Sequence, residues 1–478
     1  MLVDLAADDG WEAPAGDAQA DVVIAGGGLA GLILARRLAA LGRRVIVLEA
    51  SDALHGPESQ PLYAAQQIGQ PTLPADTTRL RWLGGSSNHW GGWCRPFAAE
   101  DMADRPHAEL PGWPFGPEVL APFLAEASAI LGFEPPLPPG PAIDGSAGQL
   151  APIAFRFSQP PWRAGEALLP ELSAAPNVTL AVNAEVAGLL VAGDRIAGFR
   201  VGRRFGQQLW PVPARVAVLA LGAMESVRQL LTLNRALDGR LGDLVGRGYM
   251  QHLHSRVGLL ARRFEGPDPA LFEDERPLFL ETTAALLAAG GSRVRFYAEQ
   301  EGCAEGSLHW DETIACAVGE AHWLRATAEQ WPSRSSRLLL GEGADWLGRP
   351  PLIIDWRPTA EDKARLRRAA LAYGAWLAGT SGWRLRLADW LIAEDASLPT
   401  PSIEDGGDRG AAGHQLGGAR MATTADRGVS DADGLVFGSG NLYLASTALF
   451  PGGGHAPPTL TLAQLTLRLA ETLDRRLG

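Results

Sequence analysis

Residues 21–49 read DVVIAGGGLAGLILARRLAALGRRVIVLE, and this stretch decides the fold. Its opening, DVVIA, is short and rich in β-branched residues, which predicts a buried strand. Residues 32–41 have the periodicity of an amphipathic helix, and residues 43–48 predict a second buried strand. A strand, a glycine-rich turn, a helix and a strand within about thirty residues form the βαβ unit of a doubly wound sheet.

The glycine-rich turn has Gly26, Gly28 and Gly31 at the spacing G-x-G-x-x-G. Gly26 permits the tight turn, Gly28 lets backbone N–H groups approach a pyrophosphate, and Gly31 lets the helix lie close to the sheet. The positive end of the helix then faces the phosphates. Glu49 lies 18 residues after Gly31, where a carboxylate can accept hydrogen bonds from ribose hydroxyls. The turn therefore predicts a dinucleotide site; the alternative is an ordinary βαβ turn that binds no nucleotide.

Length and composition set the broad class of the protein. A chain of 478 residues is too long for one simple core, so two closely joined domains are expected. No run of about 18 uninterrupted apolar residues occurs, which predicts no membrane span. The first 19 residues are acidic and lack a basic segment followed by an apolar one. We therefore expect a cytoplasmic protein.

Charge and cysteine content exclude several kinds of partner. The formal net charge of −12 disfavours a nucleic-acid partner, because phosphate binding needs a basic surface. The three cysteines, Cys94, Cys303 and Cys316, are too few for a disulfide framework and have no metal-ligand spacing. We therefore expect no metal site.

Two further parts of the chain are rich in glycine. Residues 84–93 read GGSSNHWGGW, in which two glycine pairs bracket hydroxyls, an amide, an imidazole and an indole. This composition indicates a backbone that passes close to something flat and polar. Residues 414–421 read HQLGGARM, and residues 450–463 read FPGGGHAPPTLTLA before an amphipathic helix over 459–477.

With these segments the chain resembles the glucose–methanol–choline (GMC) oxidoreductase family over nearly its whole length. The glycine turn, the 84–92 loop, ALGAMESVR at 220–228, VGR at 245–247 and both C-terminal segments occur in the order typical of that family. The likeness is greatest to bacterial members that act on sugars and related polyols. It implies an α/β fold, α+β overall, with a Rossmann-like doubly wound FAD-binding domain assembled from separated segments. A substrate domain with an antiparallel sheet would complete the fold.

The resemblance also implies a division of the chain between the two domains. The FAD-binding domain is expected to comprise residues 20–105, 170–258 and 405–478. The substrate-binding domain is expected to comprise residues 106–169 and 259–404.

FAD is the cofactor that the resemblance implies. The residues expected to bind it are Gly26, Gly28, Leu29, Ala30, Gly31, Glu49, Gly84, Gly85, Ser86, Asn88, His89, Trp90, Gly91, Val186, Ser446, Pro457 and Thr459. His89 aligns with a histidine that some sugar-oxidising members link covalently to the flavin 8α-methyl group; alternatively, it only lines the site. The helix that begins near Thr459 is expected to direct its positive end at the flavin pyrimidine.

His414 matches the catalytic histidine of the family. Removal of a hydride from an alcohol carbon requires the hydroxyl proton to be taken, and imidazole suits this task near neutral pH. One position departs from the family pattern, because Pro457 stands where members carry Asn or His, and proline offers no side-chain hydrogen bond. His455, two residues earlier, either replaces the missing contact or is an ordinary loop histidine.

Other polar residues carry weaker signals. His252 and His254 are expected to pack near the junction of the two domains. His309, His322 and Glu312 lie in the part of the chain least like the family, so they are candidates for lining a substrate pocket.

The leading hypothesis is an FAD-dependent alcohol oxidase or dehydrogenase. A hydride would pass from a sugar, glycoside or polyol-like small molecule to flavin N5, with oxygen or a quinone-like compound as the electron acceptor. The proline at position 457 leaves open a flavoenzyme repurposed for desaturation, oxidative cyclisation or elimination. A flavin-binding protein without turnover is the third hypothesis.

Overall fold

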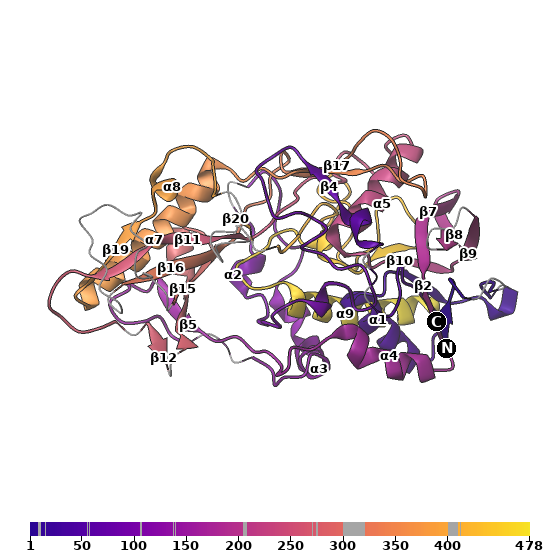
Figure 1. The fold of residues 1–478 in the computed structure, drawn as a ribbon, viewed down its shortest axis with the longest axis horizontal. Coiled ribbons are helices and arrows are strands. Elements are labelled where there is room, and N and C mark those ends of the chain that lie inside the picture. Colours follow the sequence, from indigo (N-terminus) through magenta and orange to yellow (C-terminus); the bar gives the residue numbers. More distant parts are fainter. Residues whose placement is uncertain are drawn as a thin grey trace.

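Figure 1 shows a computed structural model of the chain, an elongated molecule with a different sheet at each end. The structure describes residues 1–478 except 8–10, 15, 55, 57, 106–107, 137, 139, 204–207, 270, 274–275, 300–320, 400–409 and 412. Both termini lie at the end that holds the parallel sheet (Figure 1). Cys303, His309, Glu312 and Cys316 lie outside the described residues.

The parallel sheet has six strands in the order β1-β6-β3-β2-β10-β21. Their bounds are Leu2–Asp4 (β1), Val22–Ala25 (β2), Val45–Leu48 (β3), Val178–Val182 (β6), Val216–Leu219 (β10) and Leu442–Leu444 (β21). Strands β2, β3 and β10 are buried along their whole length, as strands covered on both faces must be. The structure confirms the predicted strands on either side of the glycine turn.

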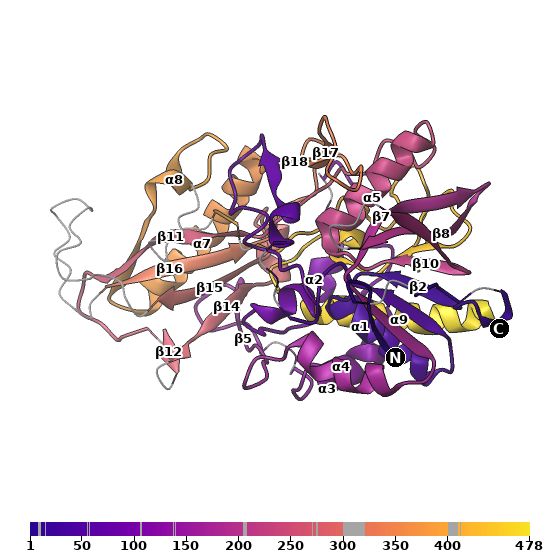
Figure 2. The same cartoon turned by 45° about the vertical axis from the view of Figure 1, so that its right-hand side comes forward.

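Alternate residues of these strands face two separate cores, because side chains point to opposite faces of a sheet. Val22 and Ile24 pack with α1 (Leu29–Ala40), α4 (Ala164–Ala174) and α9 (Thr459–Leu477). Val23 faces the other core, which a three-stranded antiparallel sheet covers. Its strands are β7 (Ala184–Ala192), β8 (Arg195–Arg203) and β9 (Leu209–Pro213), and Figure 2 shows β7 and β8 beside β10.

The second large sheet is antiparallel, as the family resemblance implies, and its main path is β19-β11-β16-β15-β14-β5, with β20 paired to β11. The bounds are Leu150–Ile153 (β5), Leu253–Arg262 (β11), Phe279–Thr282 (β14), Val294–Glu299 (β15), Ala321–Ala328 (β16), Trp383–Leu387 (β19) and Gly410–Ala411 (β20). Helix α7 (Ala360–Thr380) covers one face, where Tyr373 packs on Phe296 with ring centroids 5.2 Å apart. The opposite face carries polar side chains, since Arg295 and Tyr297 flank Phe296 along β15.

The remaining elements include a further small sheet. A three-stranded sheet in the order β17-β18-β4 lies beside α5. The bounds of the remaining elements are Ala65–Gln67 (β4), Phe272–Glu273 (β12), Arg276–Pro277 (β13), Arg337–Leu340 (β17), Leu352–Asp355 (β18), Ala99–Met102 (α2), Leu124–Ile130 (α3), Gly222–Ala236 (α5), Ala284–Ala288 (α6) and Asp389–Ile392 (α8).

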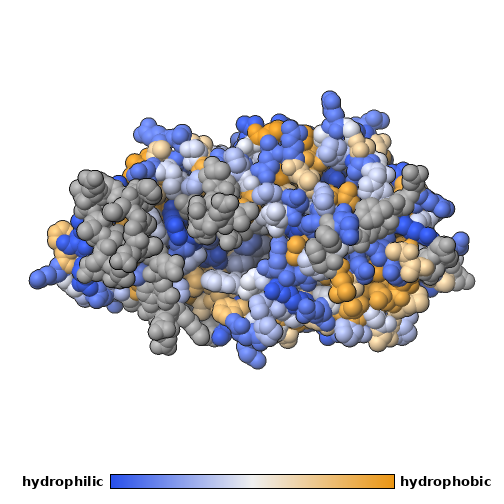
Figure 3. Space-filling view, viewed as in Figure 1, coloured by the Kyte–Doolittle hydropathy of each residue, from blue (hydrophilic) through white to orange (hydrophobic). Residues whose placement is uncertain are grey.

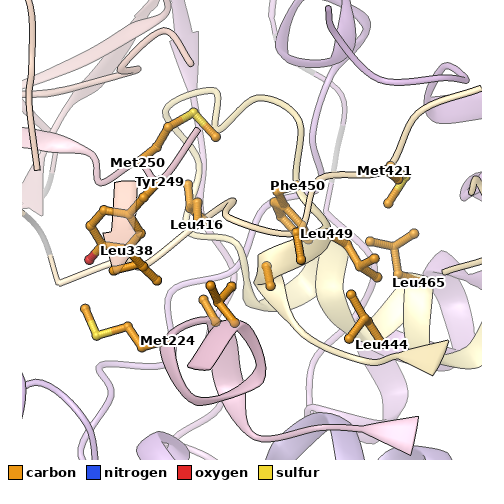
Figure 4. Close-up of a cluster of buried hydrophobic side chains, with 14 of the residues drawn as sticks. Met224, Tyr249, Met250, Leu338, Leu416, Met421, Leu444, Leu449, Phe450 and Leu465 are labelled. Carbon is orange, nitrogen blue, oxygen red and sulfur yellow. The ribbon is translucent and has the colours of Figure 1, made fainter. Parts of the chain in front are cut away.

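A buried apolar cluster joins segments that are far apart in the sequence (Figure 4). Its labelled members are Met224, Tyr249, Met250, Leu338, Leu416, Met421, Leu444, Leu449, Phe450 and Leu465. They come from α5, β17, β21, α9 and the loops between them. The cluster therefore anchors the two loops, 413–421 and 445–458, that carry His414 and Pro457.

The surface and the helices agree with the composition of the chain. Hydrophilic residues cover most of the face drawn in Figure 3. Among the described helices, none combines the length and apolarity that a membrane crossing requires. Within the same part of the chain, no group of His, Cys, Asp and Glu side chains could hold a metal ion. The division of the chain into the two expected sets of domain ranges stays a prediction.

Candidate cofactor and active site

A cavity of about 580 Å³ lies at the carboxyl end of the parallel sheet. Residues directly after four of its strands line this cavity, namely Gly26 after β2, Glu49 after β3, Ala220 after β10 and Ala445 after β21. In doubly wound folds, ligands bind in the crevice outside the carboxyl ends of the strands. The cavity therefore lies where the βαβ unit predicts a ligand.

Three helices begin at this cavity. Leu29 of α1, Gly222 of α5 and Thr459 of α9 each line it, and none of the three N-termini has a side-chain cap. The first N–H groups of a helix have no partner within the helix and carry its positive partial charge. Three such ends around one space favour a ligand that carries negative charge.

The glycines of the first turn test whether a dinucleotide fits. A Cβ atom at Gly26 would lie 2.5 Å from the carbonyl oxygen of Ala220, and one at Gly31 would lie 2.0 Å from that of Gly26. These two glycines are therefore required by packing. A Cβ at Gly28 would meet no atom within 4 Å, and Gly28 lines the cavity. A side chain there would take up only cavity space, so the turn fits a pyrophosphate lying against its backbone.

Glu49 has the chemistry expected of a ribose ligand. Its Oε2 accepts a hydrogen bond from the Gly27 N–H at 2.8 Å, and its Oε1 accepts one from the Ser51 N–H at 3.1 Å. Burial raises the pKa of this carboxyl above its usual range, against the effect of both hydrogen bonds. Each carboxyl oxygen keeps a second acceptor site toward the cavity that Glu49 lines.

The second glycine loop is held against the first turn. The Gly84 N–H donates to the carbonyl oxygen of Gly27 at 2.8 Å, and Asn88 Nδ2 donates to the carbonyl oxygen of Leu83 at 2.9 Å. Neither Gly84 nor Asn88 lines the cavity, so both support the loop from behind. The part of the loop that faces the cavity comprises Gly85, Ser86, Ser87, His89, Trp90 and Gly91.

The structure brings most of the predicted site residues together. Those that line the cavity are Gly26, Gly28, Leu29, Ala30, Glu49, Gly85, Ser86, His89, Trp90, Gly91, Val186, His414, Ser446, Pro457 and Thr459. Gly31, Gly84, Asn88 and His455 do not line it.

The cavity wall contains a buried ion pair that was not predicted from the sequence. Arg81 Nη1 donates to Glu185 Oε1 at 2.8 Å, and the second nitrogen–oxygen pair of the two groups is also bonded. The two side chains are 3% and 0% exposed. The residues are 104 positions apart, and the only local signal was the unusual pair of arginines in the segment RLRW at 79–82.

His414 lies at one side of the cavity and is bonded to a second histidine. His252 Nε2 lies 2.9 Å from the carbonyl oxygen of Gly453, which can only accept, so this nitrogen carries the proton. Burial lowers the pKa of His252 to about 4, so the ring is neutral and its Nδ1 is an acceptor. His414 Nδ1 lies 2.8 Å from that Nδ1 and must therefore donate. In neutral His414 the other nitrogen, Nε2, is then left with a free lone pair.

The expectation that His252 only packs at a domain junction is thus incomplete. Burial first, and then the repulsion that a protonated His414 would meet from the adjacent His252 and from the charge of Arg295, hold the pKa of His414 well below its usual value of 6.5. His414 is consequently an unprotonated imidazole at neutral pH. No local sequence pattern predicts this contact, because the two histidines are 162 positions apart.

His455 has different surroundings from those expected of a catalytic group. Its side chain is fully buried, and its Nε2 donates to Glu281 Oε2 at 2.6 Å. Glu281 also accepts from Arg95 and Arg293, at 3.0 Å each. This geometry does not support a second catalytic histidine at position 455, because the ring is bound within an ion-pair cluster outside the cavity lining.

Comparison with known proteins agrees with this geometry. Residues 332–466 match the family model described as GMC oxidoreductase, and residues 21–64 match that of an FAD binding domain. The first match contains His414 and Pro457, and the second contains the glycine turn and Glu49. The part of the chain that carries both C-terminal loops of the cavity is thus similar to GMC oxidoreductases. The cofactor of the protein is FAD.

Known proteins are similar to this chain over nearly their whole length. Paromamine 6'-oxidase of Streptomyces fradiae is 26% identical, over 97% of this chain and 93% of that protein. The structure of pyridoxine 4-oxidase from Mesorbium loti superposes with a TM-score of 0.59 at 20% identity, over 95% of this chain and 99% of that one. A formate oxidase variant of Aspergillus oryzae gives a TM-score of 0.57 at 17% identity, over 96% and 98% of the two chains. At these identities the two structures establish the shared fold.

Pro457 lies in the lining of the cavity, beside the start of α9. Pro458 is the N-cap of that helix. The predicted helix over 459–477 is confirmed, and both prolines precede it. Position 457 therefore presents an apolar ring to the cavity and no hydrogen-bond donor.

Proposed function

We propose that this FAD-dependent oxidoreductase oxidises an alcohol carbon of a small sugar-, glycoside- or polyol-like molecule, with His414 as the base. The free lone pair of His414 Nε2, beside the cavity that the flavin-binding segments line, is the observation that carries the proposal. The names of paromamine 6'-oxidase and pyridoxine 4-oxidase support an oxidase that uses small alcohol-like substrates.

Bound FAD would supply the acceptor for the hydride that leaves the alcohol carbon. His414 Nε2 would take the hydroxyl proton as the carbon–hydrogen bond breaks. His252 would hold the ring in the required tautomer, because its Nδ1 accepts from His414 Nδ1. The uncapped N-terminus of α9 would stabilise the negative charge that develops in the cavity. By the names of the relatives, oxygen is the electron acceptor we favour over a quinone-like compound.

The test is the visible spectrum of the holoenzyme, mixed without oxygen with a panel of sugars, glycosides and simple alcohols. Loss of the flavin colour with a panel member supports an alcohol oxidoreductase and names the substrate class. A second candidate function, an elimination or another altered flavin-linked reaction, is favoured by Pro457 at the cavity. Substrate consumption without any loss of flavin colour would select that candidate and overturn the first.

His252 is expected to act as a positioning residue. In His252→Leu the acceptor for His414 Nδ1–H is lost, so the rate constant for flavin reduction should fall about 10- to 100-fold, the usual effect of removing a group that orients a working histidine. In His252→Asn an amide oxygen can accept the same proton, and most of the rate should return. Stopped-flow reduction of both variants measures this. Equal rates in the two variants, at equal FAD content, would contradict the orienting role.

His89 tests whether the cofactor is attached covalently. Its side chain lines the cavity in the glycine loop that faces the flavin-binding segments. If His89 is bonded to the flavin 8α-methyl group, acid precipitation should leave the yellow colour in the protein pellet. The same treatment of His89→Ala should release the colour to the supernatant. Colour found wholly in the supernatant of the unmodified protein excludes the bond. Colour retained by the His89→Ala pellet would place the bond on another residue.

A further inference from the structure

Arg295, on β15 of the antiparallel sheet, is a buried cation. The residue is 6% exposed, and no carboxylate among the described residues pairs with it. Its Nε and Nη1 atoms are buried and have no hydrogen-bond partner within the same part of the chain. Burying an unpaired charge is costly, so such a group calls for an explanation.

The carboxylate directly opposite Arg295 on the sheet is already hydrogen-bonded to other side chains. Glu281 lies directly opposite Arg295 in the β14–β15 ladder. Its two oxygens, however, are bonded to Arg95, Arg293 and His455. The positive charge of Arg295 is therefore not balanced by this neighbour.

Two aromatic rings hold the guanidinium in place. Its carbon lies 5.0 Å from the ring centroid of Phe155 and 5.8 Å from that of Trp93. The rings of Trp93 and Phe155 are themselves 5.5 Å apart, and Trp93 directly follows the glycine loop at the cofactor cavity. Contacts with aromatic faces position a guanidinium but use none of its N–H donors.

The sheet register places Arg295 on the face that carries His254. Thr327 of β16 lies between His254 of β11 and Arg295 of β15, opposite both of them. His252 directly precedes β11, two residues before His254, and it contacts His414. Two strand spacings separate the His254 and Arg295 backbones by about 10 Å. After burial, the charge of Arg295 is among the causes that lower the pKa of His252 and of His414.

We propose that Arg295 binds an anionic group of the substrate, a carboxylate or a phosphate, on the side of the active site formed by the antiparallel sheet. The planar guanidinium offers several donors in a fixed fork that matches either anion. The substrate class then narrows to alcohols that also carry an acidic group. This inference rests on the proposed function for the role of the site, but anion binding itself needs no turnover.

The experiment titrates the holoenzyme with benzoate and, separately, with phenyl phosphate, followed by calorimetry and by the flavin difference spectrum. Benzamide and benzyl alcohol serve as neutral probes of similar shape. The unmodified protein should bind one of the anions more tightly than either neutral probe, and the tighter anion identifies the acidic group. In Arg295→Met that affinity should fall about 10- to 100-fold, since a charged hydrogen bond is lost, while the neutral probes bind as before.

Two further variants keep the test decisive. Arg295→Lys keeps the charge and should retain part of the anion affinity even if the Met variant folds poorly. Arg256→Met removes an arginine of the same sheet whose Nε donates to Glu299 at 2.8 Å, and it should leave the anion affinity unchanged. Equal anion affinity in Arg295→Met and the unmodified protein would overturn the proposal. Failure of the unmodified protein to prefer an anion would do the same. Anion binding without any alcohol-dependent loss of flavin colour would instead refute the proposed function alone.

Discussion

Replacing His414 by alanine is expected to lower the rate constant for substrate-dependent flavin reduction by about 10²- to 10⁴-fold, the usual contribution of a general base. Two hydrogen bonds set the tautomer of this ring: His252 donates to the carbonyl oxygen of Gly453 and accepts from His414 Nδ1. His414 Nε2 is therefore left with a free lone pair at the cavity. FAD should remain bound, because the glycine turn, Glu49 and the second glycine loop are untouched.

Anaerobic stopped-flow reduction measures this effect separately from reoxidation. His322→Ala is the matched control, since the ring of His322 stacks on Trp383 at 5.5 Å and is absent from the cavity lining. The candidate pocket role of His322 therefore stays without structural support, and its variant should reduce flavin at the normal rate. An unchanged rate in His414→Ala would remove this residue as the base.

The pH profile provides an independent check on the same residue. A base must be unprotonated, and the pKa of His414 is held well below 6.5 by burial first and then by nearby positive charge. The reduction rate should therefore be constant from pH 8 to about 6.5 and should fall only as the pH drops through the lowered pKa. A midpoint above 6.5 would contradict a buried neutral imidazole as the base.

Glu281→Gln is expected to destabilise the protein by about 3–5 kcal/mol, the usual cost of removing one partner of a buried ion pair. Glu281 accepts from Arg95, Arg293 and His455, and the side chains in this cluster are at most 4% exposed. Glutamine has the same shape but no charge, so it would leave two arginines less well compensated. The free energy of unfolding in urea measures the loss.

Glu171→Gln is the matched surface control for this change. Glu171 pairs with Arg36 at 2.8 Å, but its side chain is 54% exposed, so its loss should cost less than about 1 kcal/mol. Equal costs for the two variants would contradict the importance of burial in the Glu281 cluster.

Acid should remove the contribution of Glu281 to the free energy of unfolding in a defined pH range. Burial opposes its ionisation, but the hydrogen bond with His455 and the charges of His455, Arg293 and Arg95 outweigh it, so its pKa lies below the usual 4.5. A lowered pKa gives stability that is complete above pH 4.5 and is lost as the pH falls through the folded-state value. The difference between the unmodified protein and Glu281→Gln should therefore shrink below pH 4.5.

Local patterns were sufficient to predict the cofactor-binding half of the fold. The strands on either side of the glycine turn, the strand before Gly222 and the helix over 459–477 all have signals within a few residues. Helix α7 (Ala360–Thr380) likewise has a local signal in its N-cap Thr359, whose side chain accepts from the Asp362 N–H at 3.0 Å.

Contacts between distant segments could not be predicted in this way. Strand β1 (Leu2–Asp4) pairs with β6, and β5 (Leu150–Ile153) joins the antiparallel sheet from a proline-rich region. Neither short strand has a pattern that names its partner. For the same reason, no local pattern predicts the hydrogen bond between His252 and His414 or the burial of His455 against Glu281.

The order of the strands in the parallel sheet has a consequence for biosynthesis. Its central strand β2 lies beside β10, which in turn pairs with β21, more than four hundred positions along the chain from β2. The cofactor cavity accordingly takes walls from Gly26 near one end and from Leu462 near the other. A chain in which α9 has not yet been synthesised lacks the last of these walls, so the complete cavity forms only after α9 has packed. Contacts between residues this far apart in the sequence also form slowly. The supply of FAD while these contacts form should therefore influence the yield of folded protein.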